Sequence, residues 1–154
     1  MPVTVPMRRG LAAACLLVCA ATPAKASASA RHDALEVSII RAMNQTRAAY
    51  GLPALRASSG LARAADAHSA SMLRHNVLSH GAFSTRLRHY TRARRVGENL
   101  AWMTRCNPGS VVQMWMNSPG HRRVMLARSF KRIGVGRRAH PGRCFVTADF
   151  STAR

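Results

Sequence analysis

Two histidines and one glutamate give this chain its clearest potential chemistry. His80 and His121 flank Glu98 in the sequence, and Glu98 is one of only two glutamates in the chain. It stands between glycine and asparagine within an apolar segment, and a buried carboxylate there would need a partner. Two neutral imidazoles and a carboxylate are the ligands of a three-residue metal site with an open fourth position. The same groups could instead hold one another as a hydrogen-bonded polar cluster without metal.

Other polar residues near these three have simpler interpretations. Ser118 precedes His121 by three residues, but serine before proline is the usual N-cap of a helix. We therefore expect the Ser118 side-chain oxygen to accept the His121 backbone N–H rather than to act as a nucleophile. His68 and His75 lie seven residues apart on a helical stripe, and we interpret them as residues at the edge of the core. Glu98 is the one candidate for a catalytic residue.

Apolar periodicity predicts the elements that must position these groups. A capping box at Asp33 and Glu36 is expected to start a first helix, and Ser58 or Ser59 a second. The later elements expected, in chain order, are an irregular basic segment at 76–95, a strand at 96–102, short helices from Pro108 and Pro119, and strands at 133–136 and 144–150. Helices followed by strands, without a βαβ repeat, predict an α+β layered sandwich with a mainly antiparallel sheet.

The beginning of the chain has the features of a secretory signal peptide. An arginine pair precedes the apolar run Leu11–Ala21, and a series of Ala-x-Ala sites follows. The run has about half the length of a bilayer-spanning helix, so we predict a removable signal rather than an anchor. Cleavage is expected after Ala26, Ala28 or Ala30, and no later segment is long and apolar enough to span a membrane. The expected organisation is a signal peptide at 1–26, a leader at 27–33 and one domain at 34–154, in a secreted or cell-envelope protein.

Cleavage in this region would leave two of the four cysteines. Cys15 and Cys19 would be removed, and Cys106 and Cys144 would remain. Two cysteines in an exported chain most simply form a disulfide, because the compartment is oxidising. An acylated Cys19 in a lipoprotein is the alternative.

The charge of the chain is strongly positive and comes almost entirely from arginine. There are 24 lysines and arginines against 5 acidic residues, for a formal net charge of +19. Such a surface suits polyanions such as wall polymers or anionic lipid headgroups, although the arginines could also be simply solvated. Aromatic residues do not alternate with the arginine clusters as a base-stacking surface would require. Specific nucleic-acid recognition is therefore not expected.

Four motifs occur in order and at compatible spacings. They are His-Gly-x-Phe at 80–83, Gly-Glu-Asn-Leu-Ala-Trp at 97–102, Trp-x-x-Ser-Pro-Gly-His-Arg at 115–122 and Ile-Gly-Val-Gly at 133–136. Together they resemble the CAP superfamily, which includes cysteine-rich secretory proteins, insect venom antigen 5 and plant pathogenesis-related proteins. The short form is similar to the bacterial SCP-like extracellular proteins, and the resemblance covers roughly residues 34–150.

The resemblance implies a three-layer α-β-α sandwich with a large open cleft. In eukaryotic relatives the cleft holds two histidines, matched here by His80 and His121, and two glutamates. Glu98 matches one glutamate and has Asn99 beside it, whereas Ser118 occupies the position of the other. The family has been linked to zinc binding, to lipid or sterol binding and, in scattered cases, to hydrolysis.

From these observations we expect a secreted, non-enzymatic binding domain. His80, His121 and Glu98 would hold zinc or another divalent metal, and the cleft would take a lipid, wall-polymer or protein ligand. A metal-dependent, peptidase-like hydrolase using the same three residues is one alternative. A basic protein that binds envelope polyanions through its surface charge is the other.

Overall fold

The computed structural model describes residues 28–153, with side chains from Ala34 onward. The elements in chain order are α1 (Ala28–Ala49), β1 (Arg56–Ala57), α2 (Ser59–His75), α3 (Phe83–Arg88), β2 (Val96–Met103), α4 (Pro108–Asn117), α5 (Pro119–Met125), β3 (Arg132–His140) and β4 (Arg143–Ser151). The expected signal peptide, with its cleavage position at Ala26, lies outside the described residues. No helix within residues 28–153 has both the length and the apolar character needed to cross a bilayer.

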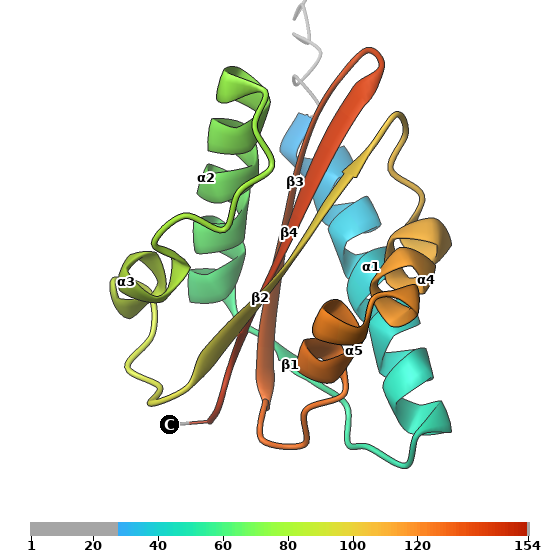
Figure 1. Ribbon diagram of the computed structural model, residues 1–154, viewed down its shortest axis with the longest axis vertical. Coiled ribbons are helices and arrows are strands. Elements are labelled where there is room, and N and C mark those ends of the chain that lie inside the picture. The colour runs from blue at the N-terminus through green and yellow to red at the C-terminus, as the bar shows by residue number, and fades with distance from the viewer. Residues whose placement is uncertain (1–27, 154) are drawn as a thin grey trace, which may run out of the picture.

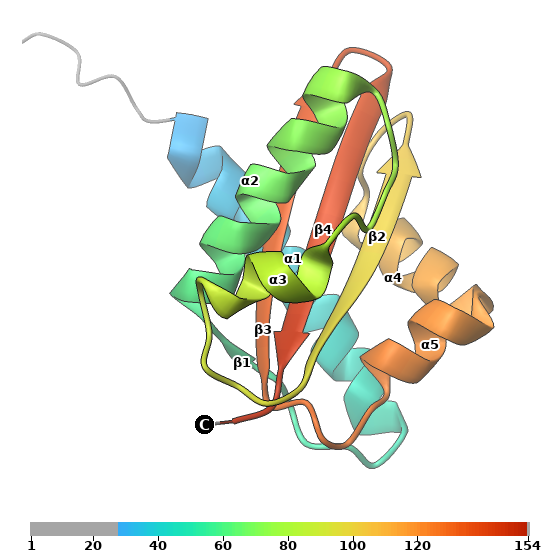
Figure 2. The ribbon, with the colours of Figure 1, turned by 60° about the vertical axis from the view of Figure 1, so that its left-hand side comes forward.

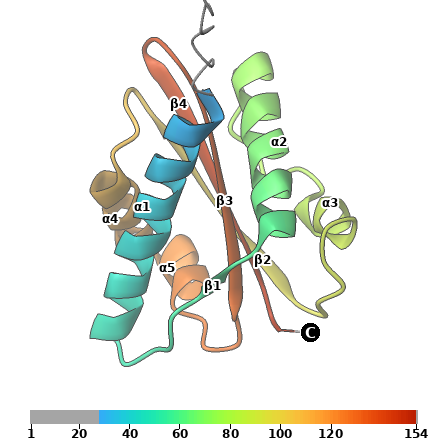
Figure 3. The same cartoon turned by 180° about the vertical axis from the view of Figure 1, so that it is seen from behind.

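The described strands form one mixed sheet between two helical layers (Figure 1). The strand order is β1-β3-β4-β2, with β1 parallel to β3 and the other neighbours antiparallel. Helix α2 packs on β3 and β4 on one face, whereas α1, α4 and α5 cover the other, as the rear view also shows (Figure 3). The expected α-β-α sandwich is confirmed, and β2 is an edge strand of the sheet.

Two glycines in β3 allow α2 to approach the sheet very closely. A Cβ atom on Gly134 would lie 2.1 Å from the Ala62 backbone nitrogen, and one on Gly136 would lie 2.1 Å from that of Asp66. No larger residue fits between strand and helix at these positions. The buried Ser69 hydroxyl on α2 also donates to the Gly136 carbonyl oxygen at 2.9 Å. The Ile-Gly-Val-Gly motif is therefore the surface on which α2 docks.

The opposite face of the sheet is joined to α4 by a hydrogen bond and by a disulfide. Trp115 of α4 is fully buried, and its indole N–H donates to the Leu100 carbonyl oxygen of β2 at 2.8 Å. The expected disulfide between Cys106 and Cys144 is present, with a Cα–Cα distance of 5.8 Å. It connects the segment before α4 to the start of β4. Both links hold the helical layer against the strands that carry the candidate site.

Two expectations about the helices are wrong. Helix α1 begins at Ala28, before the expected capping box, and the Glu36 side chain instead accepts a hydrogen bond from the Arg137 backbone N–H at 3.0 Å. The segment at 76–95 is not irregular throughout, because it contains α3. Phe83 and Leu87, four residues apart, pack on Leu61 of α2 and give this short helix an apolar side. Figure 2 shows α3 in the layer of α2, next to β2.

Candidate functional site

Glu98 is the buried centre of the candidate site. Its side chain is 0% exposed, on β2, and faces the layer of α2 and α3. Oxygen Oε1 lies 2.8 Å from His80 Nδ1, and Oε2 accepts a hydrogen bond from Arg86 Nη2. Both carboxylate oxygens are therefore occupied within the protein, as a buried carboxylate requires.

The bond to Glu98 orients His80 and sets its tautomer. A neutral imidazole that donates from Nδ1 carries its free lone pair on Nε2. The side chain is 51% exposed, so the ring can meet an external ligand. Its edge also contacts Phe83, with ring centroids 6.1 Å apart. His80 is thus an exposed imidazole whose inner nitrogen is held by a buried carboxylate.

Arg86 joins a second buried carboxyl group to the first. Its Nη2 donates to Asp149 Oδ1 at 3.2 Å, and Asp149 lies opposite Glu98 in the register of β2 and β4. Burial raises the pKa of Asp149 to about 8, with Arg86 opposing and Glu98 adding to the shift. A protonated Asp149 at neutral pH adds no second negative charge beside Glu98. The sequence reasoning overlooked Asp149 and Arg86.

His68 also belongs to this cluster, although its position on a helical stripe suggested only the edge of the core. Its Nε2 donates to the Ser79 carbonyl oxygen at 2.8 Å and lies 3.9 Å from Glu98 Oε2. Burial, followed by the charge of Arg86, lowers the pKa of His68. A neutral His68 therefore supports the segment that leads into His80.

His121 lies on α5, on the other side of the edge strand. The Asn99 side-chain amide donates to the His121 carbonyl oxygen at 3.0 Å and so ties α5 to β2. Burial, and then the charge of His80, lowers the pKa of His121, so the two rings interact electrostatically across the strand. Within the described residues, the buried His121 Nδ1 has no hydrogen-bond partner. This nitrogen is enclosed by the protein, so an external group would have to approach the ring at Nε2.

Ser118 does not make the side-chain cap expected of it. It joins two helices, because its backbone N–H donates to the Trp115 carbonyl oxygen at 3.4 Å while its own carbonyl oxygen accepts from the Arg122 N–H at 2.8 Å. No hydrogen bond links its hydroxyl to the start of α5. Ser118 thus ends α4 and begins α5, and its backbone hydrogen bonds serve both helices. Its hydroxyl caps neither of them.

Only some of these residues have the free nitrogen or oxygen atoms that a metal site needs. Across residues 28–153, no group of three or more His, Cys, Asp or Glu side chains is arranged to hold a metal ion. Both oxygens of Glu98 are engaged, which suits a group that orients a ligand better than one that coordinates directly. His80 Nε2 has no partner among the described residues, as a metal-binding nitrogen requires, whereas His121 Nδ1 is without a partner but enclosed by the protein. The three-residue metal site stays a prediction.

Apolar side chains are exposed on the segment that leads to His80 and on β2. Val77, Leu78 and Trp102 are 53%, 51% and 48% exposed. Leu78 and Trp102 line a hollow of about 280 Å³, and Val77 lines a second of about 290 Å³ that His68 also borders. The surface near the site therefore combines polar nitrogens with an apolar wall.

Comparison with known proteins places these features in context. Residues 40–150 match the model of CAP, the cysteine-rich secretory protein family. The uncharacterized membrane protein YlbC and the uncharacterized protein YkwD of Bacillus subtilis are each 32% identical, over 107 and 116 residues covering 66% and 71% of this chain. A crystal structure of an extracellular protein containing an SCP domain from Bacillus anthracis superimposes with a TM-score of 0.71 and 27% identity, covering 79% of this chain and 41% of that one.

These relatives are longer than the present chain. The matched region covers 31% of YlbC and 45% of YkwD. The shared part is thus the domain that contains the histidines and the edge strand, and it excludes more than half of each curated relative.

Proposed function

Because the chain belongs to the cysteine-rich secretory protein (CAP) family, we propose that it is a secreted, non-enzymatic binding domain. Its cleft uses His80 and His121 to hold a divalent metal, with zinc the best match to two imidazole ligands. The observation that carries this proposal is the 2.8 Å contact between His80 Nδ1 and Glu98 Oε1, because it leaves His80 Nε2 available and oriented.

Glu98 acts in this proposal as an orienting group. A histidine that binds metal through one nitrogen commonly donates its other N–H to a carboxylate, which fixes the ring and makes the ligand more basic. Arg86 holds that carboxylate in place from the opposite side. Zinc bound by two histidines would offer open positions to a polar or anionic group of a ligand.

The arrangement gives less support to a metal-dependent hydrolase. A general base must be able to take a proton from the attacking water. Both oxygens of Glu98 already accept hydrogen bonds, from His80 and Arg86. The one other buried carboxyl group near it, Asp149, is protonated at neutral pH and cannot accept a proton.

The apolar wall favours an amphipathic ligand, such as a lipid, over a fully polar one. Leu78 and Trp102 expose apolar surface that a hydrocarbon chain could cover while a polar headgroup reaches the histidines. Trp102 is exposed and Trp115 is fully buried, so a change in emission on binding would come from Trp102. Lipid that leaves the fluorescence of wild type and of Trp115→Phe unchanged would exclude this ligand class.

Zinc titration calorimetry of matched variants tests the metal site. His80→Ala and His121→Ala should each abolish binding, and Glu98→Gln should weaken it about 10- to 100-fold. His75→Ala is the control, since His75 is exposed on α2 and contacts only Ser71 there. Affinity should fall in acid as the imidazoles are protonated. The lowered pKa of His121 keeps that ring neutral to lower pH than a free imidazole.

Two results would contradict the site. If wild type binds no zinc at neutral pH, the cluster around Glu98 is a hydrogen-bonded structural group and not a metal site. If His75→Ala abolishes binding, the ligands lie elsewhere.

Export is tested separately by N-terminal sequencing of protein recovered outside the cell. The mature chain should begin between Ser27 and Arg31, whereas a product that starts at Met1 would contradict export by a cleaved signal.

A further inference from the structure

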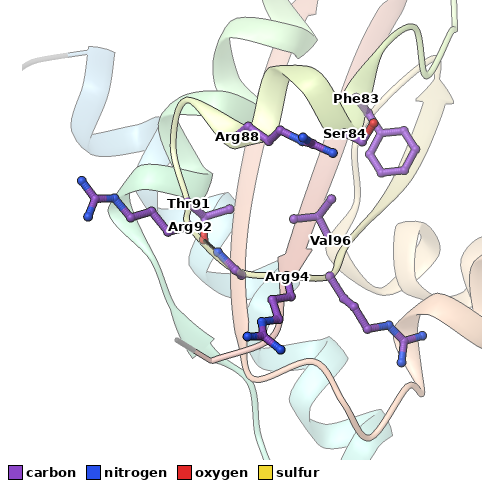
Figure 4. Close-up of a pocket in the computed structure, with 9 residues that line it drawn as sticks. Phe83, Ser84, Arg88, Thr91, Arg92, Arg94 and Val96 are labelled. Carbon is purple, nitrogen blue, oxygen red and sulfur yellow. Dashed lines mark hydrogen bonds between the residues drawn. The ribbon is translucent and has the colours of Figure 1, made fainter.

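A hollow lined with arginines lies beside α3. Neither Arg86 nor Glu98 belongs to its lining. Its volume is about 620 Å³. Its lining includes Arg88 of α3 and three arginines of the loop that leads to β2, namely Arg92, Arg94 and Arg95. Figure 4 shows Arg88 on one side of the hollow and Arg94 on the other. Four arginines within eight consecutive residues thus line one concavity, and Figure 4 shows the Arg92 side chain extending away from it.

The positive charge of this hollow is not balanced by the part of the protein that the structure describes. None of the four arginines has an ion pair or a side-chain hydrogen bond there. The carboxyl groups of Asp66, Glu98 and Asp149 pair with Arg138 or Arg86. Like charges brought together without a counter-charge destabilise a fold, so their clustering points to an external anion.

The backbone around the hollow is held in place on several sides. The Thr91 N–H donates to the Leu87 carbonyl oxygen at 2.9 Å, and the Thr152 N–H donates to the Arg95 carbonyl oxygen at 3.1 Å. Gly60 of α2 passes so close that a Cβ atom there would lie 2.8 Å from the Tyr90 carbonyl oxygen. The loop is therefore anchored to α3, to the end of β4 and to α2, and it can present its arginines in a defined arrangement.

Neutral donors accompany the arginines. Ser84 and Thr91 also line the hollow. The Thr91 hydroxyl oxygen accepts the Ala93 backbone N–H at 3.2 Å, which leaves its proton free to donate. Several planar guanidinium groups with hydroxyl donors between them match the many acceptor oxygens of phosphate better than the two of a single carboxylate.

We propose that this hollow is a second binding site, specific for ligands that carry two or more phosphate groups. Phosphate free in solution and phosphate in an anionic lipid headgroup present the same oxygens to the site. The site is independent of metal and uses none of the residues assigned to the zinc cleft.

The test compares two double variants that lose the same charge. Arg88→Gln with Arg94→Gln removes two arginines from the hollow, whereas Arg41→Gln with Arg123→Gln removes two exposed arginines from α1 and α5. Binding of inorganic tripolyphosphate is measured by calorimetry, and binding to vesicles of phosphatidylcholine with cardiolipin, whose headgroup carries two phosphates, by sedimentation. EDTA is present throughout, so the result does not depend on the zinc site.

The pocket variant should lose about tenfold or more in affinity, and the control variant less than about twofold. Ser84→Ala changes no charge and should still weaken binding a few-fold. Loss with tripolyphosphate identifies free phosphate as a ligand, and loss with vesicles alone identifies the lipid headgroup. Equal loss in both double variants would show that binding follows net charge, and absence of wild-type binding to either probe would overturn the proposal outright.

Discussion

Replacing Asp149 with asparagine tests the protonation of the buried cluster. Asparagine has nearly the shape of a protonated aspartic acid and, like it, carries one donor and one acceptor side. If Asp149 is protonated in the folded protein, Asp149→Asn should cost little stability at pH 5 to 6. The substitution should also remove the pH dependence that this residue contributes.

The sign and size of that dependence follow from the two pKa values. The folded-state pKa is about 8, above the model value of 3.8 that describes the unfolded chain. The stability contributed by protonated Asp149 is thus fully present below about pH 4 and is lost as the pH rises to about 8. Between these limits the folded state binds up to one extra proton, so the contribution falls by at most about 1.4 kcal/mol per pH unit.

Urea unfolding of wild type and variant from pH 5 to 9 measures this directly. The difference in unfolding free energy, wild type minus Asp149→Asn, should decrease as the pH rises and become constant above about pH 8. Taking the difference removes the contributions of His68 and His121, which titrate in both proteins. Asp149→Ala is the second variant and should be less stable than Asp149→Asn by about 1–3 kcal/mol at every pH, because Arg86 loses a buried partner.

A difference that stays constant from pH 5 to 9 would refute the reasoning. So would a difference that grows with pH, because an ionised Asp149 would then be the form that the fold prefers. Either result would mean that the charge of Arg86 outweighs burial and keeps Asp149 ionised.

Three further perturbations test the framework around the site by urea unfolding. Replacing both Cys106 and Cys144 with alanine should lower stability by about 4 kcal/mol, because the disulfide closes a loop with a sequence separation of 38; an unchanged midpoint would argue against the bond. Trp115→Phe should cost about 1–3 kcal/mol by leaving the buried Leu100 carbonyl oxygen without its donor. Gly136→Ala should cost about 3 kcal/mol or more, because the new methyl group overlaps the backbone of α2; a neutral effect would show that the helix can move away.

Most of the secondary structure was predictable because its signals are local. Asn107 caps α4 through its side chain, which accepts the Ser110 N–H at 3.1 Å, and Pro108 follows it at the first helical position. The alternation of apolar residues with glycine or polar residues predicted β3 and β4. The failure at α3 has a physical reason, since only six residues form it and its apolar side faces α2 rather than the main core.

The candidate site was predictable only in part. Glu98 was found because a lone acid in an apolar strand must be paired, and the same argument applies to Asp149 in β4. Arg86 had no such signal, because it is one of many arginines in a basic segment.

The sequence by itself determined the strand that carries Glu98, its need for a partner and the disulfide, since each rests on a residue type or a local pattern. Only the tertiary structure decided which partners Glu98 has. The pairing register of β2 and β4 sets Asp149 opposite Glu98, and the docking of α3 brings Arg86 to both. Those contacts join residues far apart in the chain, and a buried charge accepts any suitable partner that the packing delivers, so its choice is made by the assembled fold.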